Sequence, residues 1–350
     1  MKLATQQTSG TYSLPGGLRL LVTVTGSSNF RRKLLEARWA HYRHQFDGPA
    51  NLELHLGEFT PQIPDGARLI DKDYHVANQY LYFHGSRKGG QSEITLFDMD
   101  NRISLRHNPY TEPFPFSLSA GVRGMNMYLD PLMAWWYLRN GMTLLHASAI
   151  QRDGKTWLLV GTNGAGKTRL VLELCNKGYK FIADDLLVIQ GLEVLGIVEH
   201  PAVLSLRWKE FLRSGNAHCS KRMILRHIGH SRQPDFGSLQ LQTNGQLDGL
   251  IYLKKPFGSE SMIKPGLPEI IWKQAVRLEH LELNRHQRRH WLISNFGRFL
   301  MAYEYGMGGS DIFDTLLNSL APVPEQWLQL PAWTVSATEG FDISNILDIL

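Results

Sequence analysis

The stretch GTNGAGKT at residues 161–168 constrains the fold more than any other part of the chain, because it fits the pattern G-x-x-x-x-G-K-[ST]. An apolar run, TWLLVG (156–161), precedes it, and an amphipathic run, TRLVLELCNK (168–177), follows it. This motif carries meaning where a strand leads into it and a helix leads out of it. We therefore expect a strand, a phosphate-binding loop and a helix in this order, as is typical of α/β domains.

The residues of this loop have separate roles in holding a nucleoside triphosphate. Gly161, Gly164 and Gly166 let the backbone turn tightly enough for amide N–H groups to face a phosphate. A helix that begins near Lys167 adds the positive end of its dipole, and the Lys167 ammonium neutralises β- and γ-phosphate charge. The Thr168 hydroxyl is a ligand for Mg²⁺. The expected nucleotide-binding residues are Gly161, Thr162, Asn163, Gly164, Ala165, Gly166, Lys167 and Thr168.

Two adjacent aspartates, Asp184 and Asp185, follow the loop after one helix and one strand. The helix over residues 168–177 spans roughly 15 Å at about 1.5 Å per residue, and it leads away from the phosphates. Gly178 permits the chain to reverse, so that the extended segment 179–184 covers about 20 Å on its way back. We expect one carboxylate to hold Mg²⁺ and the other to accept a proton from an attacking hydroxyl. The alternative for the pair is a solvated turn or a helix cap.

Two large classes of nucleotide-binding protein fit the sequence poorly. An ABC-type ATPase needs a signature segment such as LSGGQ after the loop, and none follows residue 168, while GGQSE (89–93) lies upstream. A GTPase needs an NKxD-type motif that reads the base, and the chain has none. The early aspartate pair therefore favours phosphoryl transfer to a hydroxyl.

The rest of the chain suggests a second region built mostly of strands. Residues 1–125 contain short apolar or alternating runs bounded by turn residues, and we expect a β-rich N-terminal domain there. The expected strands are LRLLVTVTG (18–26), ANLELHLGEF (50–59), QYLYFHGS (79–86) and SEITLFDMD (92–100). DPLMAWWYLRNG (130–141) looks helical, and we assign residues 126–350 to a catalytic domain.

Further elements are expected around the loop. TLLHASAI (143–150) reads as one apolar strand, joined to TWLLVG by the hairpin-like turn QRDGK. The other expected strands are YKFIA (179–183), LLVIQ (186–190), part of LGIVEHPAVLSLR (195–207), LDGLIYLKK (247–255) and LPAWTV (330–335). The basic segment 213–238 has no clean periodicity, and we expect a solvated loop or lid there.

Composition sets broad bounds on partners and location. The formal charge of +5 fits an anionic ligand such as a nucleotide. The two cysteines have no metal-ligand spacing, and no apolar run approaches the length that spans a bilayer. We therefore expect a cytoplasmic protein with no membrane partner.

Several of these segments, taken in order, resemble the catalytic domain of HPr serine kinase/phosphorylase and its related kinases, whose fold is shared with phosphoenolpyruvate carboxykinase. The resemblance rests on His146 in LLHASAI, on GTNGAGKT, on ELCNKGYKFIADDLLVI and on HPAVLSLR. It covers about residues 140–350. It implies an α/β fold with a P-loop kinase domain of the HPr kinase/phosphoenolpyruvate carboxykinase type.

The resemblance also implies catalytic roles. Asp184 would deprotonate the acceptor hydroxyl, Asp185 and Thr168 would position Mg²⁺, and His146 would lie near the transferred phosphoryl group beside Lys167. For His146 taken alone, the alternative is a core or strand-edge histidine. ATP and Mg²⁺ are the implied cofactors. Many related kinases form oligomers, which suggests a homo-oligomer here.

The acceptor stays open at this point. We favour a serine of a peptide or protein, because the β-rich region and the basic segment 213–238 offer recognition surface. A small-molecule hydroxyl such as free serine is the first alternative, and a nucleotide-gated binding protein with little transfer is the second. Basic clusters at 221–232 and 285–290 raise a nucleic-acid-linked function, but such runs are more often solvated faces, so no nucleic-acid partner is expected.

Overall fold

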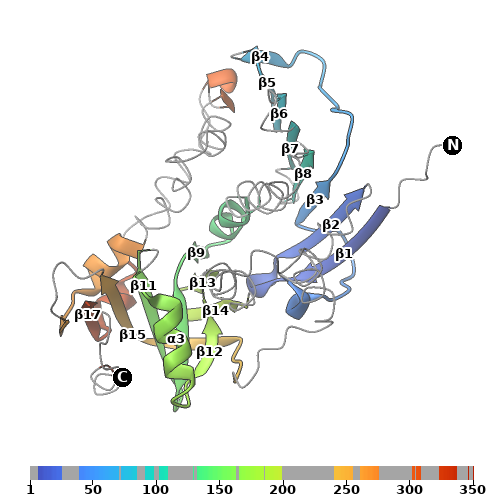
Figure 1. The fold of residues 1–350 in the computed structure, drawn as a ribbon. Coiled ribbons are helices and arrows are strands. Elements are labelled where there is room, and N and C mark those ends of the chain that lie inside the picture. The colour runs from blue at the N-terminus through green and yellow to red at the C-terminus, as the bar shows by residue number, and fades with distance from the viewer. Residues whose placement is uncertain are drawn as a thin grey trace, which may run out of the picture. The chain divides into compact units, whose positions relative to one another are not determined.

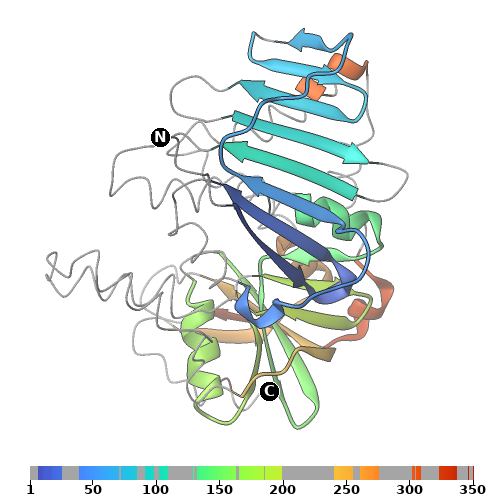
Figure 2. The ribbon, with the colours of Figure 1, turned by 90° about the vertical axis from the view of Figure 1, so that its right-hand side faces the viewer.

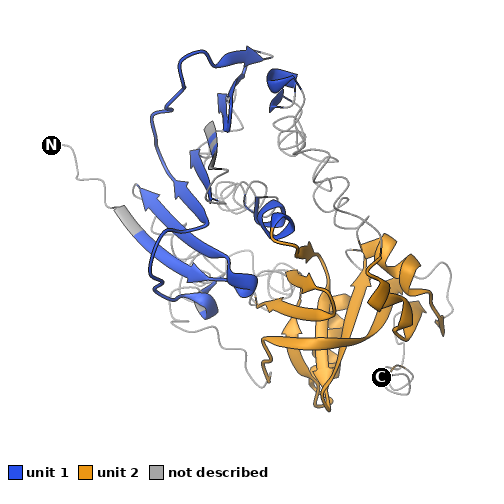
Figure 3. Cartoon of the chain, turned by 180° about the vertical axis from the view of Figure 1, so that it is seen from behind, with its two compact units in different colours: residues 1–139, 221–233, 283–320 blue, residues 140–220, 234–282, 321–350 orange. Residues whose placement is uncertain are grey.

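The computed structural model describes residues 7–25, 39–70, 72–84, 91–97, 102–108, 129, 132–162, 165–184, 186–198, 240–254, 261–275, 302–303, 305–308, 323–336, 346 and 350. The described elements are many strands and few helices, so the protein is mixed α/β. Contacts divide the chain into two compact units (Figure 3). Unit 1 comprises residues 1–139, 221–233 and 283–320, and unit 2 comprises residues 140–220, 234–282 and 321–350. The boundary expected between residues 125 and 126 lies outside the described residues.

Unit 1 contains a sheet of eight described strands in the order β1-β2-β3-β8-β7-β6-β5-β4 (Figure 2). The strands are β1 (Gln7–Ser13), β2 (Arg19–Thr25), β3 (Leu52–Leu56), β4 (Arg68–Ile70), β5 (Tyr74–Ala77), β6 (Tyr80–His84), β7 (Gln91–Phe97) and β8 (Arg102–Asn108). β3 is parallel to β2 and β8, whereas the other neighbours are antiparallel. Alternate residues of β2, β3 and β8 are buried, so one face of the sheet lies in the core.

Segments distant in sequence pack onto this sheet. Residues 132–139 are helical, as expected, and the Tyr137 hydroxyl donates to the Pro15 carbonyl at 2.7 Å in the short helix η1 (Pro15–Gly17). A second short helix, η2 (Ala40–Tyr42), precedes β3. Near the other end of the sheet, Arg68 donates to the Gly306 carbonyl at 3.0 Å. Tyr137 and Gly306 therefore contact segments of unit 1 that are far from them in sequence.

Unit 2 is built on nine described strands, and the helix α3 follows β11 in the chain (Figure 1). Seven strands follow the order β12-β10-β11-β15-β14-β13-β9, while β17 pairs with β15 and β16 pairs with β17. The elements are β9 (Thr143–Leu145), β10 (Ser148–Arg152), β11 (Lys155–Gly161), α3 (Lys167–Cys175), β12 (Lys180–Ala183), β13 (Leu186–Gln190), β14 (Glu193–Ile197), β15 (Asn244–Lys254), β16 (Met262–Pro265), η6 (Glu325–Gln329) and β17 (Ala332–Ser336). Residues 268–275 are also helical.

The long strand β15 joins two parts of this sheet. Its first residues, Asn244–Gln246, pair antiparallel with β14, and from Leu247 onward it pairs parallel with β11. Its last part, Leu250–Lys254, also pairs parallel with β17. The strand that leads into the phosphate loop therefore lies between β10 and β15, in the interior of the sheet.

The structure corrects one expected element and confirms the turn that follows it. TLLHASAI is not one strand, because β9 ends at Leu145 and β10 begins at Ser148. The strand is interrupted between these two elements because β9 pairs with β13, whereas β10 pairs with β11 and β12. The hairpin turn between β10 and β11 is present, and Asp153 and Gly154 both have positive φ in it, as a two-residue hairpin requires.

Within the described ranges, no helix combines the length and the apolar character needed to cross a lipid bilayer.

Candidate functional site

The phosphate loop begins where β11 ends and closes where α3 begins. Within it, the Ala165 N–H donates to the Thr162 carbonyl at 2.9 Å, which makes a tight turn. Gly166 is the N-cap residue of α3, with φ of 97° and ψ of 13°. Asn163 and Gly164 lie outside the described residues. The strand, loop and helix therefore follow one another in the order that the sequence predicts.

Two glycines of the loop are required by backbone geometry. Gly161 pairs with Leu253 of β15, and a Cβ at Gly161 would lie 2.6 Å from the Leu253 carbonyl oxygen. No other residue fits this approach without moving a strand. Gly166 has open space around it, but its positive φ is one that other residues adopt only with strain. These glycines fix where the loop starts and how the helix begins.

Lys167 is the first residue of α3, and its side chain folds back over the loop. Its ammonium donates to the Gly161 carbonyl at 2.7 Å, and the residue is only 6% exposed. This hydrogen bond joins the first residue of α3 to Gly161, the first residue of the loop. A buried ammonium needs such acceptors, because desolvation disfavours its charge. The contact therefore holds a positive charge at the loop.

The start of α3 offers further groups that suit an anion. Gly166 provides no side-chain cap, and the first turn contains no acidic residue. Thr168, the second residue of the helix, is partly exposed. Backbone N–H groups of a helix's first turn have no partner within the helix, and the helix dipole makes this end positive. Together with Lys167, this end of α3 has the chemistry of a phosphate site.

α3 is anchored by its apolar face. Leu170, Val171 and Leu174 are buried, and the helix packs against β10, β11 and β12 (Figure 1). At its far end Gly178, with φ of 94°, turns the chain back into β12. The reversal that the sequence predicts is therefore present.

Three neighbouring strands bring the loop and Asp184 to one edge of the sheet. β10 is antiparallel to both β11 and β12, so β11 and β12 run in the same direction. The phosphate loop leaves the end of β11, and Asp184 directly follows the end of β12. Both therefore lie at the same edge, which is also where β10 begins. Asp185 lies outside the described residues.

Asp184 is held at this edge by a hydroxyl. The Ser148 Oγ, at the start of β10, donates to Asp184 Oδ1 at 2.6 Å. Ser148 is 0% exposed and Asp184 is 5% exposed. A hydrogen bond of this length to a carboxylate is of the strong, charge-assisted kind. Ser148 is a site residue that the sequence analysis missed.

His146 lies in the break between β9 and β10 and is half-buried. It comes two residues before Ser148, whose register partner in β11 is Leu159. The start of β10 faces the end of β11, so His146 belongs to the same edge of the sheet as the loop. The structure thus brings His146, Lys167 and Asp184 to one edge.

The Asp184 carboxylate also influences the thiol near the end of α3. Burial, and then the negative charge of Asp184, raise the pKa of Cys175 to about 12. A thiol with such a pKa stays protonated at neutral pH and is a poor nucleophile. Cys175 is therefore not a nucleophile at neutral pH.

Among the described residues, no group of three or more His, Cys, Asp or Glu side chains is arranged to hold a metal ion. Of the two expected Mg²⁺ ligands, Thr168 lies at the loop edge, and Asp185 lies outside the described residues. Hydroxyl and carboxylate oxygens are the ligands that Mg²⁺ prefers, usually alongside water and substrate phosphates. The Thr168 hydroxyl is a donor of this kind.

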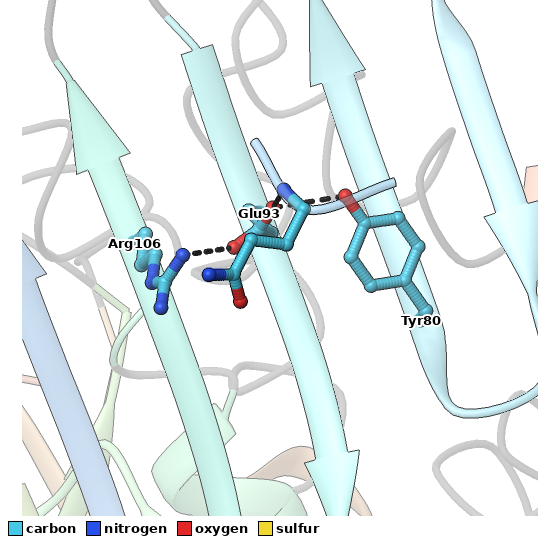
Figure 4. Close-up of polar contacts among 4 residues, drawn as sticks. Tyr80, Glu93 and Arg106 are labelled. Atoms are coloured by element: carbon cyan, nitrogen blue, oxygen red, sulfur yellow. Dashed lines mark hydrogen bonds and ion pairs between the residues drawn. The ribbon is translucent and has the colours of Figure 1, made fainter. Parts of the chain in front are cut away.

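Unit 1 contains a different buried carboxylate, Glu93 in β7, which is 3% exposed (Figure 4). Glu93 Oε2 accepts from the Tyr80 hydroxyl at 2.9 Å and from the Gln62 N–H at 2.7 Å. Its Oε1 lies 3.0 Å from the Arg106 guanidinium. Burial, and then the hydrogen bond to Glu93, raise the pKa of the Tyr80 phenol above its usual value. This cluster ties three strands to the segment that follows β3.

A comparison of the sequence with protein-family models finds no match, and a comparison with curated proteins finds none either. Any functional assignment therefore rests on the residues and geometry of unit 2.

Proposed function

We propose that this protein is a Mg²⁺–ATP-dependent kinase that transfers the γ-phosphoryl group to a hydroxyl, with a serine of a peptide or protein as the favoured acceptor. The observation that carries the proposal is the buried Asp184 carboxylate, which lies at the same sheet edge as the phosphate loop. We also propose the HPr kinase/phosphoenolpyruvate carboxykinase type of P-loop fold for unit 2. Its support is the order of strand, loop, helix and returning strand.

The loop and the start of α3 would bind the triphosphate. Backbone N–H groups of the first turn face the phosphates, and the Lys167 ammonium adds a full positive charge. The Gly161 carbonyl that now accepts from Lys167 keeps this side chain on the loop. Thr168 would hold Mg²⁺, and Asp185 is the second residue expected to do so. When bound, Mg²⁺ neutralises charge on the phosphates.

Asp184 would act as the general base. Its carboxylate accepts the proton of the acceptor hydroxyl while that oxygen forms a bond to the γ-phosphorus. The bond from the γ-phosphorus to the bridging oxygen breaks, and its electron pair leaves with ADP. Lys167 stabilises the charge that spreads over the phosphoryl oxygens. His146 would lie beside the transferred group.

A labelled-transfer assay tests this proposal. The protein would be incubated with γ-labelled ATP, Mg²⁺ and an extract of its source cell, separated into small molecules, peptides and proteins. We expect label in the peptide or protein fraction with the wild type and none with Asp184→Asn. Label only in small molecules would keep the kinase but change the acceptor class. Label left on ATP, or released only as inorganic phosphate, would contradict the kinase and favour a nucleotide-gated binding protein.

A binding measurement supports the interpretation of that assay. Lys167→Ala removes the loop's ammonium, so its affinity for ATP should fall, whereas Asp184→Asn should bind ATP nearly as well as the wild type. Isothermal titration of both variants would measure this difference. An unchanged ATP affinity in Lys167→Ala would contradict the phosphate-loop assignment itself.

A further inference from the structure

Ser148 has no part in the transfer as described, yet its hydroxyl contacts the proposed base. We propose that Ser148 is a positioning residue for Asp184, and that its hydrogen bond fixes the orientation of the carboxylate toward the acceptor. This inference rests on the proposed kinase function. It assigns a role to a residue on a different strand from both the loop and the base.

The contact depends on an irregularity in the pairing of β10 with β12. In this ladder Ile150 pairs with Phe181, but Ala149 pairs with Ala183, so the register shifts by one residue between them. The next positions along are Ser148 and Asp184, which are joined by the 2.6 Å hydrogen bond. Bulges of this kind often redirect a side chain near an active site.

Regular pairing would not produce this contact. Continued without the shift, the register set by Ile150 and Phe181 would place Asp184 opposite Ala147. If β10 were continued back through Ala147, the side chains of Ala147 and Ser148 would point to opposite faces of the sheet. The extra residue in β12 therefore brings the carboxylate to the face of the Ser148 hydroxyl.

The chemistry of the pair suits a fixed base. An ionised carboxylate only accepts hydrogen bonds, and a serine hydroxyl has one proton to donate. When this proton is directed at Oδ1, the plane of the carboxylate is set, and with it the direction in which Oδ2 points. Because both groups are buried, this hydrogen bond is strong and little disturbed by water.

The test compares Ser148→Ala with a matched loss of another buried hydroxyl. Thr156, at the far end of β11 from the loop, is also 0% exposed, and its Oγ1 accepts from Gln151 at 3.1 Å. Thr156→Val removes this hydroxyl with little change in volume. For each protein, kcat, the KM for ATP and the melting temperature would be measured with the acceptor found above.

We expect Ser148→Ala to lower kcat by about 10- to 100-fold while the KM for ATP stays unchanged, since a misplaced catalytic group costs rate rather than nucleotide binding. Ser148→Cys, which keeps the size and a weak donor, should have a kcat between those of the wild type and Ser148→Ala. Thr156→Val should match the wild type in kcat.

Each other outcome has a definite meaning. A wild type that labels an acceptor, with Ser148→Ala equal to it in kcat, would overturn this inference alone. An equal loss of kcat in Thr156→Val would assign Ser148 a purely structural role. Phosphate on Ser148 itself, found by mass spectrometry, would make it an acceptor instead. A wild type that labels nothing would overturn the proposed function and this inference together.

Discussion

Glu93 in unit 1 and Asp184 in unit 2 are both carboxylates buried among strands, but they are placed differently. Glu93 lies in the middle of β7 and meets a phenol, a backbone N–H and a guanidinium from neighbouring segments. Asp184 lies just past the end of β12, where the phosphate loop also leaves the sheet. Burial alone therefore does not distinguish the two carboxylates. We propose that its position at the end of a strand is what suits Asp184, rather than Glu93, to the role of a base.

The partners of the two carboxylates differ in charge as well. Glu93 has a cationic partner, Arg106, which offsets part of the cost of burying its charge. Asp184 accepts from the neutral Ser148 hydroxyl. A cation bound directly to a base would compete with the proton that the base must accept. Replacing each carboxylate by its amide tests this contrast directly.

The largest effect is expected for the rate of transfer. Asp184→Asn should lower phosphoryl transfer by about 10²- to 10⁴-fold, the usual contribution of a general base. Glu93→Gln should leave the rate unchanged, because Glu93 lies in unit 1 and has no part in the proposed chemistry. Both would be measured with γ-labelled ATP at a temperature at which both variants are folded. Equal losses of transfer rate in the two variants would contradict the assignment of Asp184, rather than Glu93, as the base.

The second effect is expected for stability. Glu93→Gln should lower the free energy of unfolding of unit 1 by about 2 kcal/mol, because Arg106 and two donors lose a charged acceptor. The loss is smaller than for a fully buried ion pair, since the Arg106 side chain is 33% exposed. Hydrogen exchange in peptides from β6, β7 and β8 would report it. Unchanged exchange there would contradict the stabilising role of the cluster.

A smaller loss of stability is expected when one donor is removed. Tyr80→Phe deletes the hydroxyl that Glu93 accepts and should cost about 1.5 kcal/mol. The control is Tyr82→Phe on the same strand, whose hydroxyl has its hydrogen-bond contact with His84 Nδ1, at 3.1 Å. Tyr82→Phe should lower the free energy of unfolding by less than Tyr80→Phe does. The opposite order of the two losses would show that the carboxylate is not the decisive partner.

The smallest effect is expected in the alkaline pH dependence. Burial raises the pKa of Tyr80 in the folded protein, whereas an unfolded tyrosine has a pKa of about 10. Above that pH the unfolded chain releases a proton that the folded chain keeps, so stability falls as pH rises. Tyr80→Phe should make this decline shallower. Melting temperatures between pH 8 and 11, chosen to bracket the tyrosine pKa of about 10, would measure it, and parallel curves would contradict it.

Sequence patterns predicted the centre of unit 2 well, because a local motif and regular apolar runs determine it. The helix expected over residues 168–177 is α3 (Lys167–Cys175), and the returning strand is β12. In unit 1 the four strands expected from alternating or apolar runs are present as β2, β3, β6 and β7. Local periodicity was sufficient where one face of an element is buried.

Features that depend on pairing could not be predicted. β1 (QTSGTYS) has little apolar character of its own and is a strand because it pairs with β2. The break at His146 arises because two flanking strands join different partners, and the Ser148–Asp184 contact arises from a register shift. No pattern within one segment reveals either feature. Asn163, Gly164, Asp185 and the segment 213–238 lie outside the described residues and stay predictions.

The close fit of Gly161 against Leu253 has a consequence for how the protein is made. β11 leads into the loop and emerges from the ribosome well before β15. It therefore lacks this parallel partner until a distant part of the chain has been synthesised. Early folding of α3 alone would not complete the proposed nucleotide site. A ligand stabilises only the states that bind it. With the proposed function, ATP would therefore support the folding of nascent chains only after synthesis has passed β15.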